Sequence, residues 1–182
     1  MPTCFVIMPL STPPDAVRAY ESDDHFRHAL AELHTPAIMR AGYDVIPPKV
    51  ENSEVIQAEI IKHLATADLV VCDISTLNPK VIFELGICVA LDRPVAMIKD
   101  DQTPVIPFDN SIVSCHTYNS RIHPWTVRAE IPRLAEWVKR AGEQKRNALW
   151  RHFGPDAQRL PVTSDFDTAV EKLVQFAGLA RR

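Results

Sequence analysis

The alternation of short apolar runs with longer amphipathic segments constrains this sequence more than any other feature. Five runs have the length and composition of strands: residues 3–8, 43–46, 68–74, 94–98 and 111–117. The segments between the first four of these runs are long enough for helices. Strands that alternate with helices in this way are typical of a parallel sheet that is covered on both faces. The sequence therefore predicts a three-layer α/β domain with about five parallel strands.

Helices are predicted where apolar residues recur three and four positions apart. One such segment runs from about residue 22 to Gly42, and we expect Pro36 to kink it. A second helix is predicted over residues 53–65. Later in the chain, one helix is predicted to begin near Pro132 and a last one near Ser164.

Charge divides the chain near residue 120. Residues 1–120 hold 8 Lys and Arg against 16 Asp and Glu, whereas residues 121–182 hold 12 against 7. We expect the first part to be the α/β domain and the second a helical, net basic extension. The extension is predicted to pack on the acidic body or on a second copy of it, which favours a homo-oligomer. Its charge is weak for nucleic-acid binding, so contact between this tail and nucleic acid is only a third alternative.

Composition excludes several protein classes. With 46% apolar and 24% charged residues, the chain has the composition of a globular protein. No apolar stretch approaches the ~18 residues of a membrane span, and no signal peptide is recognised, so the predicted location is the cytoplasm and no membrane partner is expected. The cysteines lack paired C-x-x-C spacing, and His25 and His28 lack a third ligand, so no metal site is predicted.

A ligand site is expected at one edge of the predicted sheet. Ligands of open parallel α/β sheets bind beyond the carboxyl ends of the strands. This rule points to the loops that follow Met8, Asp73 and Ile98. The common glycine-rich loops that hold nucleotide phosphates are absent from the sequence.

Glu84 is the residue that most needs an explanation. It is the only charged residue in the predicted helix 81–91, which Asn78 opens as the N-cap. An ion pair with Lys80, one turn earlier, would explain it, and so would a buried carboxyl hydrogen-bonded to backbone. A desolvated carboxylate is also a mark of active sites. The position of Glu84, in the second turn of a helix that opens at the expected ligand site, favours the functional interpretation.

The region around Glu84 resembles a known family. Residues 73–95 read DISTLNPKVIFELGICVALDRPV, and they are similar to the strand, loop and helix of nucleoside 2-deoxyribosyltransferases and their bacterial TIR-like relatives. The segments CFVIMP, residues 4–9, and PFD, residues 107–109, resemble the TIR-like group. The resemblance covers about residues 3–118.

This resemblance implies a flavodoxin-like fold and cleavage of the N-glycosidic bond of a nucleoside, a nucleotide or NAD. Glu84 matches the family's glutamate, which attacks or stabilises the sugar C1′ as the base departs. Asp73 matches an acid that contacts the base or sugar, so both residues are predicted to be catalytic. Loss of a base leaves positive charge on the ribose, and a fixed carboxylate stabilises that charge more than it stabilises the neutral substrate. No cofactor is implied, since the nucleotide is the substrate or ligand.

The departures from the family pattern bear on the substrate. Asn78 stands where deoxyribosyltransferases carry an aspartate, and an amide cannot act as general acid, which suits a leaving group such as nicotinamide. Lys80 would lower the pKa of Glu84 and could hold a substrate phosphate. The loop after the first strand matches an element that closes over the sugar or base. The predicted substrate-binding residues are Met8, Pro9, Leu10, Arg18, Tyr20, Ser75, Asn78 and Lys80.

Two functions of different class follow. The first is an enzyme that hydrolyses or transfers at the N-glycosidic bond of a nucleotide, NAD above all. The resemblance to TIR-like relatives implies a role as a bacterial defence effector that stays silent until a signal or a partner of the defence system assembles it. The alternative is a binding module in which the same site senses a nucleotide without turning it over and signals through oligomerisation.

Overall fold

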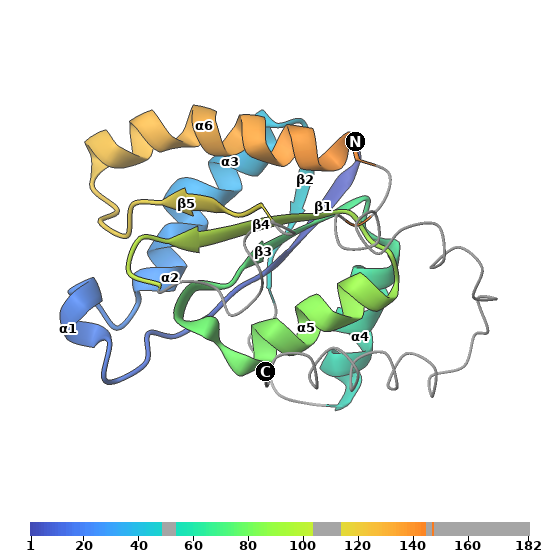
Figure 1. Cartoon of the computed structure of the whole chain (residues 1–182), viewed down its shortest axis with the longest axis horizontal. Helices are drawn as coiled ribbons and strands as arrows, with labels where there is room; N and C mark the ends of the chain where they lie inside the picture. Colours follow the sequence, from blue (N-terminus) through green and yellow to red (C-terminus); the bar gives the residue numbers. More distant parts are fainter. Residues whose placement is uncertain (49–53, 104–113, 145–146, 148–182) are drawn as a thin grey trace, which may run out of the picture.

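A five-stranded parallel sheet forms the centre of the protein. The computed structural model describes residues 1–48, 54–103, 114–144 and 147. The strand order is β2-β1-β3-β4-β5, and every neighbouring pair is parallel (Figure 1). The strands are β1 (Thr3–Ile7), β2 (Asp44–Ile46), β3 (Leu69–Asp73), β4 (Val95–Asp100) and β5 (His116–Tyr118).

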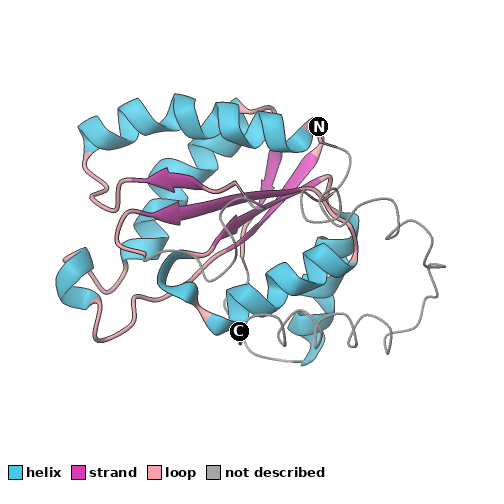
Figure 2. Ribbon diagram, in the orientation of Figure 1, coloured by secondary structure: helices cyan, strands magenta, loops and turns pink. Residues whose placement is uncertain are grey.

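Helices cover both faces of this sheet, as Figure 2 shows. On one face lie α2 (His25–His28), the π-helical segment η1 (Ala29–His34), α3 (Thr35–Arg40) and α6 (Pro124–Gly142). On the other face lie α4 (Glu54–Thr66) and α5 (Pro79–Ala90). Two shorter segments, α1 (Val17–Tyr20) and the 3-10 turn η2 (Ser75–Leu77), lie in the connections. The predicted three-layer, flavodoxin-like α/β fold is therefore confirmed.

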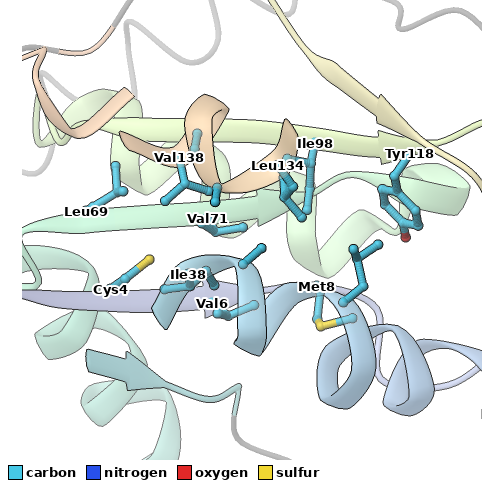
Figure 3. Close-up of a cluster of buried hydrophobic side chains, with 14 of the residues drawn as sticks. Cys4, Val6, Met8, Ile38, Leu69, Val71, Ile98, Tyr118, Leu134 and Val138 are labelled. Carbon is cyan, nitrogen blue, oxygen red and sulfur yellow. The ribbon is translucent and has the colours of Figure 1, made fainter. Parts of the chain in front are cut away.

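The apolar runs form strands because both of their faces are buried. Along β1, Cys4 and Val6 belong to the core on the α3/α6 side, whereas Phe5 and Ile7 belong to the core on the α4/α5 side. Such strands lack the alternation of polar and apolar residues found where one face meets solvent. Figure 3 shows the first of these cores, to which β1, β3, β4 and α6 all contribute side chains.

The first long helical region differs from the prediction. Instead of a helix kinked at Pro36, the chain forms a π-helical turn at residues 29–34, immediately before α3. The N–H of Thr35 bonds to the carbonyl of Leu30, five residues earlier. Pro36 then occupies the first turn of α3, where its missing N–H costs little. The wider π turn thus accommodates the proline.

Helix α6 lies within the expected extension 121–182 and packs directly on the sheet. Leu134, Ala135 and Val138 are buried in the α3/α6 core. The helix begins at Pro124, so the predicted start near Pro132 is wrong, and Pro132 lies inside the helix on its exposed side. Packing of the buried face offsets the backbone bond that this proline removes.

Some predicted elements lie outside the described residues. These are residues 111–113 of the fifth predicted strand, the PFD segment and the helix that begins near Ser164. Within the ranges that the structure describes, none of the helices is both long enough and apolar enough to cross a membrane.

Candidate functional site

A pocket of about 190 Å³ opens where the strand order of the sheet reverses. From β1 the chain passes to β2 on one side, and from β3 it passes to β4 on the other, so the connections after β1 and β3 diverge at this point. Ligands of doubly wound α/β folds bind in the crevice at this switch point. The pocket is lined by Phe5, Val6, Ile7, Met8, Pro9, Leu10, Ser11, Pro48, Ile60, Asn78, Lys80, Val81 and Glu84.

Two walls of the pocket come from the segments that the sequence indicated. The end of β1 and the loop that follows it contribute Met8, Pro9 and Leu10. The first two turns of α5, with the residue before them, contribute Asn78, Lys80 and Glu84. The structure therefore brings six predicted site residues together around one cavity.

Glu84 is a buried residue whose carboxylate is unbonded within the described part of the chain. The residue is 7% exposed, and burial raises the pKa of its carboxyl, although the charge of Lys80 opposes that shift. Among the described residues, no donor lies within hydrogen-bond distance of this carboxylate, and the ammonium of Lys80 is not within ion-pair distance. Neither the ion pair nor the backbone-bonded carboxyl considered above therefore accounts for Glu84 in this part of the chain. A desolvated carboxylate without a partner is free to interact with a ligand.

Asn78 fixes the start of α5. Its side-chain oxygen accepts a hydrogen bond from the backbone N–H of Lys80 at 2.9 Å, and Pro79 takes the first helical position. Because the oxygen is used in capping, the amide NH₂ is the group that Asn78 can offer to a ligand.

Asp73 and Ser75 do not line this pocket. Asp73 is fully buried, and burial raises the pKa of its carboxyl to about 6. One of its carboxylate oxygens accepts hydrogen bonds from the N–H and hydroxyl of Ser75, and the other accepts one from Tyr118 at 2.7 Å. The carboxylate of Asp73 is therefore engaged in hydrogen bonds that connect the end of β3 to Ser75 and to the end of β5.

Arg18 and Tyr20 also lie outside the pocket lining. Arg18 is exposed on α1. The hydroxyl of Tyr20 donates to a carboxylate oxygen of Asp100 at 2.6 Å, in a buried position. Tyr20 therefore contacts the end of β4, whereas the sequence had predicted that it would bind the substrate.

Sequence reasoning missed Asp100 and Thr103. Asp100 is buried at the end of β4, and Thr103 donates to its carboxylate through both backbone N–H and hydroxyl. Together with Tyr20, Asp73, Ser75 and Tyr118 they form a hydrogen-bonded set that we call the strand-end network. The available signal was the position of Asp100, which follows the apolar run 94–98 after one intervening residue, in a loop that the strand-end rule had indicated.

His34 is a second buried group that the sequence did not indicate. It ends the π-helical segment, is fully buried, and packs edge-on against Tyr118. Its Nε2 lies 3.6 Å from Asp73, which is too long for a hydrogen bond, and neither ring nitrogen has a partner among the described residues. Burial lowers the pKa of His34 to about 3, so the ring is neutral and forms no ion pair with Asp73.

Within the described residues, no three His, Cys, Asp or Glu side chains are grouped as metal ligands would be.

No family model matches the sequence, and no curated protein matches it. The case for a function therefore depends on the geometry and chemistry of the pocket.

Proposed function

We propose that this protein cleaves the N-glycosidic bond of a nucleotide in the pocket at the β1/β3 switch point, with Glu84 as the catalytic carboxylate and NAD as the substrate. The observation that carries the proposal is that the buried residue Glu84 lies in the lining of that pocket and that its carboxylate makes no hydrogen bond to any residue the structure describes. Asp73, which the family resemblance suggests as a second catalytic acid, has a structural role in this proposal.

The reaction requires stabilisation of positive charge at the sugar. As the C1′–N bond breaks, its electron pair leaves with the base and the ribose becomes cationic. The carboxylate of Glu84 either stabilises this cation or forms a C1′–O bond with it. Water then adds its hydroxyl to C1′ and releases a proton, and where a C1′–O bond to Glu84 has formed, that bond breaks and frees the carboxylate, which completes hydrolysis. Attack by a second base at C1′ would break the same bond and complete transfer.

The lining favours a base that leaves without being protonated. Among the described lining residues, Glu84 and Lys80 are the titratable groups, and in this proposal Glu84 is assigned to the sugar and the Lys80 ammonium to a phosphate. The amide of Asn78 can orient a base but cannot protonate it. Nicotinamide carries its positive charge while it is bonded to the ribose and leaves as a neutral molecule, so NAD fits this lining.

Lys80 and Ser11 supply polar groups for the remainder of a nucleotide. Lys80 is exposed at the start of α5, and Ser11 is exposed in the loop after β1. An ammonium and a hydroxyl at the rim can hold a phosphate while the sugar lies beside Glu84. A pocket of about 190 Å³ suits the ribose and part of the base, so the rest of a dinucleotide would extend along the rim.

The test is release of base from NAD, nucleoside monophosphates and deoxynucleosides by the parent protein and by Glu84→Gln. Because Glu84→Gln keeps the shape and removes the charge, we expect release from NAD to fall at least about a hundredfold. The matched control is Glu130→Gln, which changes a buried glutamate of α6 that bonds to His116 and lies outside the pocket lining. This control should keep the parent rate.

A second outcome separates the enzyme from the nucleotide sensor. Saturable NAD binding without base release, in parent and variant alike, would favour the sensor and contradict the catalytic proposal. The assay spans a range of protein concentrations, because the protein is proposed to act as a homo-oligomer or with an activating partner, and oligomers form only above a certain concentration.

A further inference from the structure

The turn between β3 and α5 has an unfavourable backbone conformation. Thr76 has a φ of 60° and Leu77 a φ of 50°, both in the left-handed region. This region is sterically unfavourable for a residue that is not glycine, and β-branched residues such as threonine rarely adopt it. Such a conformation persists only where surrounding contacts hold it.

Thr103 supplies a contact that holds this turn. Its hydroxyl accepts a hydrogen bond from the backbone N–H of Thr76 at 2.9 Å and donates one to Asp100 at 2.6 Å. The backbone N–H of Thr103 donates to the same oxygen of Asp100 at 2.7 Å. Thr103 is buried, so these bonds are protected from water.

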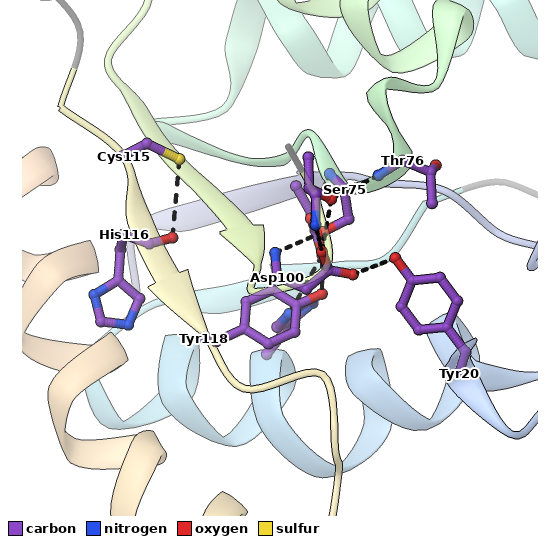
Figure 4. Close-up of polar contacts among 10 residues, drawn as sticks. Tyr20, Ser75, Thr76, Asp100, Cys115, His116 and Tyr118 are labelled. Atoms are coloured by element: carbon purple, nitrogen blue, oxygen red, sulfur yellow. Dashed lines mark hydrogen bonds and ion pairs between the residues drawn. The ribbon is translucent and has the colours of Figure 1, made fainter. Parts of the chain in front are cut away.

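Asp100 is itself fixed from two directions. Its other carboxylate oxygen accepts the hydroxyl of Tyr20, and its backbone N–H donates to the hydroxyl of Ser75 at 2.9 Å. Figure 4 shows these contacts converging at the end of β4. Thr103 therefore connects a fixed strand end to the strained turn.

The turn determines where α5 begins. Asn78, the N-cap of α5, directly follows Leu77, and Lys80 and Glu84 lie in the next two turns of helix. Functional side chains must be held to within about 0.5 Å of their productive positions. We infer that Thr103, through its hydrogen bond to Thr76, is the positioning residue that places the first two turns of α5 and directs Glu84 into the pocket.

The first test is amide hydrogen exchange, which needs no substrate. Thr103→Val keeps the shape and removes the hydroxyl, whereas Thr103→Ser keeps the hydroxyl. Loss of the hydrogen bond should accelerate exchange in the first two turns of α5, beginning with the Ile82 amide that bonds to Asn78, by about fivefold to tenfold. Thr103→Ser should keep the parent rates.

A matched control separates positioning from general loss of stability. The hydroxyl of Thr126 donates to the carbonyls of Arg121 and His123 at the start of α6, remote from the pocket lining. Thr126→Val should therefore accelerate exchange in the first turn of α6 and leave α5 unchanged. Equal acceleration throughout the protein in Thr103→Val would contradict the positioning role.

Thr76→Gly tests the strain directly. Glycine adopts a positive φ freely, and the Thr76 hydroxyl is buried without a partner among the described residues, so its removal loses no bond found there. In the Thr76→Gly background, the effect of Thr103→Val on α5 should shrink to about twofold. An undiminished effect would overturn the inference. If Thr103→Val alone does not fold, the double variant must fold for the inference to stand.

The link to Glu84 is tested by base release, and it depends on the proposed function. Thr103→Val should lower kcat for NAD by about tenfold, and Thr103→Ser should restore it. If Thr103→Val has the same kcat as the parent protein, the inference is overturned and the proposed function is unaffected. No base release by the parent, together with the expected exchange pattern, would contradict the proposed function and leave the placement of α5 by Thr103 standing.

Discussion

At the scale of single residues, the contrast between Glu84 and Asp73 decides which acid is available for chemistry. Both are buried, and burial raises the pKa of both. Asp73 accepts hydrogen bonds from Ser75 and Tyr118, whereas Glu84 accepts none from the described residues and lines the pocket. Spacing in the sequence identified both acids, but the hydrogen bonds that occupy Asp73 depend on Tyr118, 45 residues away.

Lys80 gives a prediction at this scale. Its positive charge lowers the pKa of Glu84, opposing the effect of burial. Lys80→Met should therefore raise the pKa of the Glu84 carboxyl further above its ordinary value. If the ionised form acts at C1′, the acidic limb of the pH–rate profile should move to higher pH.

The measurement is a ¹³C NMR titration of the Glu84 carboxyl carbon in parent and variant. Lys139→Met, which removes an exposed charge on α6, is the control and should leave that titration unchanged. An unchanged or lower pKa of Glu84 in Lys80→Met would contradict the prediction that the charge of Lys80 lowers this pKa.

At the scale of elements, α5 is the part of the fold that the sequence defined best. The N-cap, the first-turn proline and the apolar helix were all predicted, and the structure confirms them. The π-helical turn before Pro36 was not predicted, because a change from i−4 to i−5 bonding leaves no periodicity signal within a single turn. The strained turn at Thr76 was also not predicted, since neither Thr76 nor Leu77 is typical of a positive φ.

The cap of α5 gives the prediction at this scale. Asn78→Ala removes the acceptor of the Lys80 N–H and should lower the free energy of unfolding by about 1 kcal/mol. Asn78→Asp keeps an acceptor at the helix N-terminus and should stay close to the parent. Urea denaturation of the three proteins checks this, and equal stability of all three would mean that the cap contributes nothing.

At the scale of the whole molecule, α6 belongs to one of the two helical layers that cover the sheet. Its buried residues join the same core as β1, β3 and α3. Its N-terminal half also fixes β5, because Glu130 pairs with His116 at 2.6 Å. A change of net charge near residue 120 therefore does not mark the end of packing against the sheet.

Leu134 tests this arrangement. Leu134→Ala would leave a cavity between α6 and the sheet and should lower the free energy of unfolding by about 2–5 kcal/mol. One cooperative transition by both circular dichroism and tryptophan fluorescence is expected. Loss of α6 in a separate, earlier transition would show that this helix folds independently of the sheet.

The sequence by itself determined the three-layer fold and the location of the candidate site. Buried parallel strands must be continuously apolar, helix ends need caps, and ligands bind at the carboxyl ends of strands, so local patterns carry this information. Only the tertiary structure decided which polar residues reach the pocket. Glu84 lies in its lining, whereas Asp73, Ser75 and Tyr20 join the strand-end network with Asp100 and Thr103. The bonds of Asp100 to Tyr20 and to Ser75 connect residues 80 and 25 positions apart, and no local pattern specifies them.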